Sequence, residues 1–291
     1  MSTISTSGGD ENIVFVHRKS YGQWIVGALV LVIAASLVHS LWTNPRLGTD
    51  VIWRYLFSEP VLRGVWMTLK LTVVIFAIGL CLGLVLALMG RSANPVLRGT
   101  AWAYTWIFRA VPPLVQLILW AFLAALYPKL EFGIPFTDIV FISADTNDVM
   151  QPYVAAIIGF SLIEAAYQGE VIRAGLLSVP SSQNEAAQAL GYSGWQTFTR
   201  IILPQAMPAI VPPSANNIII LLKGTSLVSV IGAVELLTTV QQIYAETYQV
   251  IPLLFVASIW YLVLTSLLML GQRYLERRYS RGRLAVGGEL A

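Results

Sequence analysis

The sequence contains few of the residues that metal sites and soluble enzymes depend on. It has one cysteine, Cys81, and two histidines, His17 and His39, in 291 residues. A single cysteine excludes an intrachain disulfide and a cysteine-rich metal site. The two histidines are too far apart in the sequence to form a helical metal-binding pair. The chain also lacks the G-x-x-x-x-G-K-[ST] motif, so it contains no P-loop for ATP.

Charge is the second scarce property. Charged residues make up 11% of the chain, whereas soluble proteins carry about 25%. Hydrophobic residues make up 56%, and the mean hydropathy is +0.70. The net charge of +3 is no evidence for nucleic-acid binding, because so few basic residues are present. This composition predicts an integral membrane protein.

Long apolar runs predict an all-α membrane protein with six transmembrane helices, since about 20 apolar residues cross a bilayer as a helix. The runs are at 22–42, 65–89, 100–127, 153–178, 209–233 and 252–271. The polar segment before the first run is too long and too acidic for a signal peptide, so we expect that helix to be retained.

Basic residues in the loops predict the orientation of these helices. The tail at 273–291 contains five arginines, and the loop at 90–99 contains two. In contrast, 128–152 has one lysine among four acidic residues, and 235–251 has no basic residue. Three arginines at 43–64 count against the scheme. On balance, both termini and the polar segment described next are predicted to be cytoplasmic.

The polar segment at 179–208 lies between two apolar runs and predicts two short helices. Ser182 precedes Glu185 by three residues, which is the spacing of a capping box at a helix N-terminus. Gly191 suits the left-handed residue that ends a helix.

The second helix of this segment is expected to begin at Ser193, which precedes Gln196 at the same spacing, and to end at Pro204. The pattern resembles the spacing of a DNA-binding helix-turn-helix. However, Arg200 is the only basic residue between 179 and 208, and DNA affinity comes largely from several basic side chains. Nucleic-acid binding is therefore not expected.

Acidic and basic side chains within the apolar runs are candidates for function. Glu164 lies near the middle of the fourth run, where a charged carboxylate costs about 2.5–3.5 kcal/mol. Tyr167 and Gln168 share its helical face. We expect this face either to line a water-filled path, with Glu164 meeting a substrate ammonium group, or to be structural, with Glu164 pairing with Lys223 of the fifth run.

Other polar residues in the runs have simpler explanations. Glu170 and Arg173, at a spacing of three, are expected to pair with each other. Arg109 precedes a Pro-Pro pair that must break the third run, and a broken helix at membrane depth is tolerated where it lines a cavity. Arg109 and Gln116 are therefore further candidates for substrate binding. Lys223 is also a candidate, for substrate binding or gating. Gly79 and Gly83 form a G-x-x-x-G motif, expected to pack helices within one bundle or between subunits.

Four segments, in order, resemble permease subunits of ABC importers of the polar amino acid uptake family. "EAAQALG" followed by "ILP" is similar to the E-A-A loop of these permeases. "FRAVPPLVQL", "LPQAMPAIVPPSANN" and "LLKGTSLVSVIG" are similar to its neighbouring segments. The resemblance covers about residues 60 to 280.

The resemblance implies a type I ABC importer permease core at 61–272, an extra N-terminal helix at 22–60, a cytoplasmic segment at 1–21 and a basic tail at 273–291. It implies transport of polar or charged amino acids by alternating access in a bacterial inner membrane. The 179–208 loop would dock on a separate ATPase. The implied coupling residues are Gln183, Glu185, Ala186, Ala187, Leu190, Gly191 and Pro204.

The resemblance also implies partners: an ATPase dimer that binds ATP and Mg, a second permease subunit, an extracytoplasmic substrate-binding protein and membrane lipid. Two other functions were weighed. A membrane enzyme would need a nucleophile with a base or a metal site, and none is apparent in the sequence. An ion- or proton-coupled secondary transporter is the alternative, although such proteins usually show internal repeats.

Overall fold

The computed structural model describes residues 21–134, 137 and 139–280. The chain divides into two compact units, with the boundary between Leu47 and Gly48. The first contains α1 (Tyr21–Trp42) and the short 3-10 helix η1 (Pro45–Leu47). Every side chain described in α1 is exposed within the chain, and the helix is long and apolar enough to cross a membrane.

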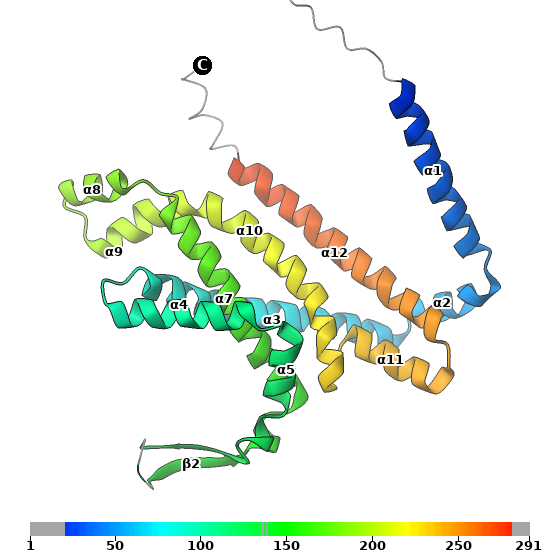
Figure 1. Cartoon of the computed structure of the whole chain (residues 1–291), viewed down its shortest axis with the longest axis horizontal. Helices are drawn as coiled ribbons and strands as arrows, with labels where there is room; N and C mark the ends of the chain where they lie inside the picture. Colours follow the sequence, from blue (N-terminus) through cyan, green and yellow to red (C-terminus); the bar gives the residue numbers. More distant parts are fainter. Residues whose placement is uncertain (1–20, 135–136, 138, 281–291) are drawn as a thin grey trace, which may run out of the picture. The chain divides into compact units, whose positions relative to one another are not determined.

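The second unit is a bundle of long helices shown in Figure 1. Its N-terminal half contains α2 (Thr49–Leu56), α3 (Glu59–Gly90), α4 (Pro95–Ala110), α5 (Pro113–Ala121), η2 (Leu123–Ala125), β1 (Lys129–Gly133), β2 (Val140–Asp145), α6 (Thr146–Val149) and α7 (Pro152–Leu177). Its C-terminal half contains α8 (Ser181–Ala189), α9 (Gly194–Thr197), η3 (Phe198–Ile202), α10 (Leu203–Gly224), η4 (Thr225–Ile231), α11 (Leu236–Thr247) and α12 (Val250–Ser280).

Among the described residues, five helices are long and apolar enough to span a membrane, compared with six expected runs. They cover Gly22–Trp42, Glu59–Gly90, Pro152–Leu177, Gly194–Ile231 and Val250–Tyr279. The run expected at 100–127 consists instead of α4 and α5, which are separated at Val111 and Pro112. The predicted break at the proline pair is thus confirmed. Proline lacks an amide hydrogen and suits the first turn of a new helix.

Glycines join α3 and α7 along a close seam. Gly79 and Gly83 are buried, and a Cβ on either would lie within 2.8 Å of the side chain of Glu164 or Gln168. Small residues at this spacing let two helix backbones approach closely. The G-x-x-x-G motif therefore packs helices within this bundle, which is one of the two roles expected from the sequence.

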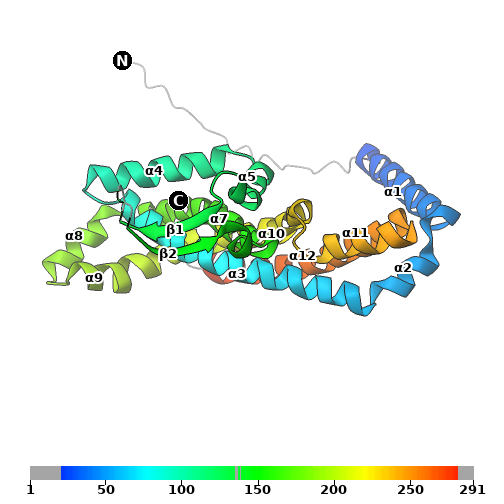
Figure 2. The ribbon, with the colours of Figure 1, turned by 90° about the horizontal axis from the view of Figure 1, so that it is seen from below.

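A two-stranded antiparallel hairpin interrupts the helical fold between α5 and α7. Phe132 pairs with Ile142 and Leu130 pairs with Ala144, so these four side chains share one face of the hairpin. The sequence analysis expected no strand here, because two strands of five and six residues give too short an alternating pattern to stand out. Figure 1 shows the hairpin extending away from the helices below α5, and in Figure 2, seen from below, it overlaps them.

The polar segment forms two short helices as expected, but two of its boundaries differ from the prediction. The helix α8 begins at Ser181 after Pro180, and no side chain caps it. Ser182 thus lies inside the first turn, where it cannot act as the N-cap, and the predicted Ser182–Glu185 capping box is wrong. The second predicted box is confirmed, since Ser193 and Gln196 exchange both hydrogen bonds.

Pro204 does not end the second helix, which corrects the other boundary. The chain widens into the π-helical turn η3 and continues directly into α10. Pro204 lies in the first turn of α10, where the missing amide hydrogen is tolerated. The polar segment therefore leads into a membrane helix without an intervening loop.

Candidate functional site

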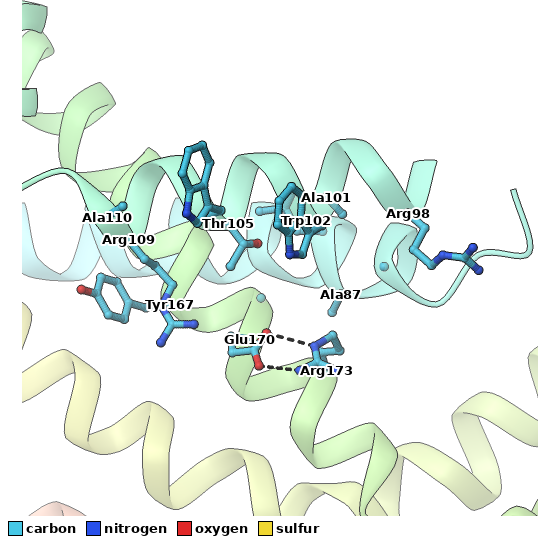
Figure 3. Close-up of a pocket in the computed structure, with 14 residues that line it drawn as sticks. Ala87, Arg98, Ala101, Trp102, Thr105, Arg109, Ala110, Tyr167, Glu170 and Arg173 are labelled. Atoms are coloured by element: carbon cyan, nitrogen blue, oxygen red, sulfur yellow. Dashed lines mark hydrogen bonds and ion pairs between the residues drawn. The ribbon is translucent and has the colours of Figure 1, made fainter. Parts of the chain in front are cut away.

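A pocket of about 770 Å³ lies between α3, α4 and α7 (Figure 3). Small residues such as Ala87, Gly90 and Ala101 leave room for it, and larger polar and aromatic side chains come from α4 and α7. The pocket-lining residues with functional groups are Arg98, Trp102, Thr105, Trp106, Arg109, Tyr167, Glu170 and Arg173.

Arg109 and Tyr167, both predicted from the sequence, meet in this pocket. The guanidinium carbon of Arg109 lies 5.5 Å from the centre of the Tyr167 ring, which is the geometry of a cation–π contact. Figure 3 shows the two side chains side by side at one end of the pocket. Arg109 is the last basic residue of α4 before the helix break. The break therefore brings a positive charge to the face of α7 that carries Tyr167.

Glu170 and Arg173 form the salt bridge that their spacing predicts. Nε and Nη2 of Arg173 donate to the two carboxylate oxygens of Glu170, at 2.9 and 2.5 Å (Figure 3). The pair lines the pocket and leaves Arg98 and Arg109 as its other charged side chains. The pocket thus carries three guanidinium groups and one carboxylate, which favours a ligand with a carboxylate.

Glu164 and Gln168 lie behind the pocket, in a buried network between α7 and α10. Glu164 is 6% exposed, and its Oε1 accepts a hydrogen bond of 2.7 Å from Nε2 of Gln168. The hydroxyl of Ser214 donates to Oε1 of Gln168 at 2.8 Å. Gln168 is fully buried. Glu164 and Tyr167 are thus one helical turn apart on α7 but differ strongly in exposure.

Lys223 does not pair with Glu164 in this structure. Lys223 is exposed near the end of α10, where the chain tightens into η4. Among the described residues, the salt bridges join Glu59 to Arg63 and Glu170 to Arg173. The structural alternative proposed from the sequence for Glu164 therefore lacks its ion pair.

Gln116 stabilises the helix break. Its Nε2 donates to the carbonyl oxygens of Phe108 and Val111, at 3.0 and 2.7 Å. These carbonyls belong to the end of α4 and to the residue after it, and the last carbonyls of a helix have no intrahelical partner. Gln116 is buried and does not line the pocket between α3, α4 and α7.

The predicted coupling residues lie on α8 and its C-terminal turn. Gly191 has φ +77°, and the amides of Gly191 and Tyr192 donate to the carbonyls of Gln188 and Ala187. This is the Schellman arrangement that ends a helix at a left-handed glycine, as predicted. Ala187 packs inward, whereas Glu185, Ala186 and Leu190 are exposed.

The remaining coupling residues connect α8 to α10. Oε1 of Gln183 accepts a hydrogen bond of 3.0 Å from Nε2 of Gln205, the residue after Pro204. Leu190 is 75% exposed and Trp195 is 73% exposed. The α8–α9 region thus presents apolar side chains to the outside of the chain while its base is fastened to α10.

Glu235 was not predicted as a functional residue from the sequence, and it is completely buried at the start of α11. Its Oε2 accepts from the hydroxyls of Tyr261 and Thr68, at 2.6 and 3.2 Å. Its Oε1 accepts from the amide of Thr238 at 2.8 Å. The carboxylate thus joins α3, α11 and α12. The only sequence signal was an acidic residue in a loop without basic residues, which also fits a solvated position.

No group of three or more histidine, cysteine or acidic side chains within residues 21–134, 137 and 139–280 could hold a metal ion. The pocket and the buried networks instead contain guanidinium, carboxylate, hydroxyl and amide groups. Such groups can bind and orient a polar ligand.

Comparison with known proteins identifies the family of the chain. Residues 79–281 match the family described as binding-protein-dependent transport system inner membrane component. The arginine transport system permease protein ArgU of Corynebacterium glutamicum is 40% identical over 90% of this chain and 81% of its own length. The L-cystine transport system permease protein TcyB of Bacillus subtilis is 35% identical, over 81% of this chain and 94% of its own length.

A solved structure shows the same fold. The crystal structure of an amino acid ABC transporter with histidines contains a chain that is 31% identical to this one, with a TM-score of 0.63. The match covers 76% of this chain and 95% of that chain. The chain therefore belongs to the family of binding-protein-dependent transport system inner membrane components and is a permease subunit of an ABC importer.

Proposed function

We propose that this permease carries a polar or charged amino acid, and that the pocket between α3, α4 and α7 binds it. The placement of Arg109 on the Tyr167 ring carries this proposal. A guanidinium group binds a carboxylate with two parallel hydrogen bonds, and every free amino acid has a carboxylate. The names of the relatives, which refer to arginine and L-cystine transport, support an amino-acid substrate.

We propose Glu164, which does not line the pocket in this structure, as the second contact of the substrate. It lies one turn from Tyr167 on α7, and a substrate ammonium group matches its charge. Glu164 is held by Gln168 in this structure, so binding exchanges an amide partner for an ammonium partner. An ammonium donor adds the attraction of opposite charges to the hydrogen bond, whereas the amide of Gln168 carries no charge, and this favours the exchange.

Coupling to ATP hydrolysis is proposed for the α8–α9 region. Its exposed Leu190 and Trp195 and its rigid Schellman turn form a short projecting element. We propose that it docks on a separate ATPase, which binds ATP and Mg, with one such loop for each ATPase subunit. A second permease subunit and a substrate-binding protein complete the proposed complex.

The arginine distribution supports a cytoplasmic location for both termini and for α8–α9. We propose residues 61–272 as the transport domain. In the structure, α2 also belongs to the larger unit, because it packs against α12.

Uptake by the complete complex in proteoliposomes tests the substrate site. Arg109→Gln is expected to lower amino-acid uptake by roughly 10- to 150-fold, because one hydrogen bond to a charged group contributes about 1.5–3 kcal/mol. Arg98→Gln is the matched control, since it removes the same charge from the same pocket without a Tyr167 contact. Equal losses in both variants would contradict a specific site at Arg109.

The same proteoliposomes distinguish the alternative function. An ABC importer takes up substrate only when ATP is present on the side of the vesicle membrane where its ATPase lies. Its ATP hydrolysis is also stimulated by the ligand. An ion- or proton-coupled transporter takes up substrate without ATP when an ion gradient is applied. ATP-independent uptake driven by a gradient would overturn the proposal.

A further inference from the structure

A second cavity, of about 640 Å³, lies between α3, α10 and α12, on membrane-spanning segments. Its lining is apolar apart from Cys81, Ser214, Gly271 and Gln272. In Figure 1, α3 and α12 separate toward the α8–α9 end of the bundle, and α10 runs between them. We call this cavity the α10 groove. A groove of this composition suits a hydrocarbon chain and does not suit the amino-acid substrate.

Exposed arginines lie in the segments that continue two walls of the α10 groove. Leu203 of α10 and Leu275 of α12 both line it, and they mark the end nearest α8–α9. Arg200 lies three residues before Leu203, and Arg278 lies three residues after Leu275. On the α-helix α12, residues three apart share a face, so Arg278 continues the groove-lining face by one turn. Arg200 lies in the π-helical turn η3, within one turn of Leu203. Both side chains are exposed.

The third wall of the groove follows the same pattern. Leu84 of α3 lines the groove, and Arg91, which is exposed, ends that helix two turns later. The acidic side chain nearest this end on α12 is Glu276, which accepts a hydrogen bond of 2.8 Å from Gln272. The segments that continue α3, α10 and α12 at this end thus carry Arg91, Arg200 and Arg278 against Glu276, which is an excess of positive charge.

We propose that the α10 groove binds an anionic phospholipid, with one acyl chain in the groove and the headgroup on Arg200 and Arg278. Basic residues at the membrane surface attract anionic lipid headgroups, and basic pockets between helices bind them specifically. The arginines at this end favour an anionic lipid over two other occupants, a neutral lipid and an apolar helix of another chain. Neither of these carries a negative charge that the arginines could bind.

The groove also contacts the buried network described above. Ser214 lines the groove, and its hydroxyl holds Gln168, which in turn holds Glu164. A lipid chain in the groove thus packs directly against the residue that positions Gln168. We therefore expect the lipid composition of the membrane to influence uptake as well as binding.

Native mass spectrometry of the full chain in its transporter complex tests the headgroup site. Phosphatidylglycerol is expected to remain bound more tightly than phosphatidylcholine with the same acyl chains. Arg200→Gln and Arg278→Gln should each weaken phosphatidylglycerol binding by roughly 5-fold, as expected for one basic residue near an anionic headgroup. The double variant Arg54→Gln/Lys129→Gln removes two exposed charges far from the groove and should bind as the wild type does.

Alkylation of the native Cys81 tests the acyl-chain site without a substitution in the protein. Cys81 is the single cysteine and lines the groove, so N-ethylmaleimide should react with it more slowly in vesicles that contain phosphatidylglycerol than in phosphatidylcholine alone. Ala215→Phe, which fills the groove, should reduce the retention of phosphatidylglycerol.

Three results would overturn the proposal. One is equal retention of the two lipids by the wild type. Another is unchanged phosphatidylglycerol binding in both arginine variants. The third is a Cys81 reaction rate that does not depend on lipid composition, including protection in every lipid, which would indicate a protein occupant such as a second copy of the chain.

Discussion

At the scale of single residues, Glu164 combines a costly location with a weak partner. A charged carboxylate at membrane depth costs about 2.5–3.5 kcal/mol. Its partner in the structure is the amide of Gln168, and Lys223 is exposed elsewhere on α10. A visiting substrate ammonium group accounts for the charge without a fixed cation.

This account predicts different effects of Glu164→Gln on uptake and on stability. The glutamine carbonyl can still accept from Gln168, so the free energy of unfolding should fall by no more than about 1.5 kcal/mol, the contribution of an ordinary hydrogen bond. Uptake should fall by roughly tenfold or more, because the charge that meets the ammonium group is lost. Thermal unfolding and uptake, measured on the same preparation, check both.

The double variant Glu164→Gln/Lys223→Met is the control. The effects of the two substitutions on the free energy of unfolding should add to within about 0.5 kcal/mol, as for groups that do not interact. A large destabilisation by Glu164→Gln that Lys223→Met reverses would show a buried ion pair and contradict the proposal.

Glu235 gives a prediction about stability alone. Glu235→Ala leaves the donors of Thr68, Tyr261 and Thr238 without their acceptor and should lower the free energy of unfolding by about 3 kcal/mol or more. Glu235→Gln should cost less, because the amide oxygen still accepts on one side while the amide NH₂ opposes a donor on the other. Tryptophan fluorescence during thermal unfolding measures the order of the variants.

The exposed Glu246 on the same helix is the matched control for Glu235. Glu246→Ala should leave the unfolding temperature nearly unchanged, since surface substitutions usually alter stability by less than about 0.5 kcal/mol. A decrease in unfolding temperature as large as that of Glu235→Ala would show that replacing any acidic residue of α11 is harmful. The buried network would then not be the cause.

The sequence predicted some of these side chains and not others for a physical reason. Arg109, Tyr167 and the Glu170–Arg173 pair were identifiable, because local spacing along one helix or next to a proline pair determines them. Ser214 and Glu235 were not, because their partners lie 46 residues away on Gln168 and 167 residues away on Thr68. Such contacts depend on helix packing, which a single sequence does not specify.

At the scale of elements, the α8–α9 turn has the clearest backbone requirement. Gly191 has φ +77°, and no atom lies within 4 Å of the position of a Cβ. Substitution there is therefore limited by backbone conformation and not by space. Gly191→Val should destabilise the turn by about 1–2 kcal/mol, the cost of a left-handed residue with a side chain.

The functional result of Gly191→Val should be weaker association with the ATPase, while membrane insertion is retained. Co-purification of the ATPase and ATP-dependent uptake measure it. Gly99→Val is the control, since a Cβ there also meets open space but the backbone is helical. Normal ATPase association of the Gly191 variant would contradict the coupling role of this turn.

The elements themselves were predictable where hydrophobic length and proline position determine them. The five long apolar helices and the break between α4 and α5 follow from these features. The π-helical turn before Pro204 and the hairpin of β1 and β2 could not be predicted from these features. The former replaces an expected helix end with a wider turn, and the latter relies on cross-strand pairs such as Phe132 with Ile142.

At the scale of the whole molecule, the orientation in the membrane remains a prediction. Ser182→Cys and Ser143→Cys, each in a Cys81→Ala background, place one thiol on α8 and one on the hairpin. Both serines are exposed, and the replacement is close in size. An impermeant maleimide applied to sealed cells should label the hairpin cysteine and label α8 only after lysis.

Labelling of both cysteines from the same side would contradict the orientation, and labelling of α8 alone in intact cells would reverse it. Reaction of both thiols after lysis is the control for accessibility. This measurement does not depend on transport activity, so it separates a wrong orientation from a wrong substrate.

The glycine seam of α3 and α7 has a mechanical consequence. Helix α7 has 26 residues and a length of about 39 Å, and it connects the hairpin region at one end to α8 at the other (Figure 1). Because α3 packs against it without space for a methyl group at Gly79 or Gly83, the close packing opposes sliding of one helix past the other and favours tilting of the two as a unit. A rotation of α7 about its middle, near Glu164, would then move α8 and the hairpin in opposite directions.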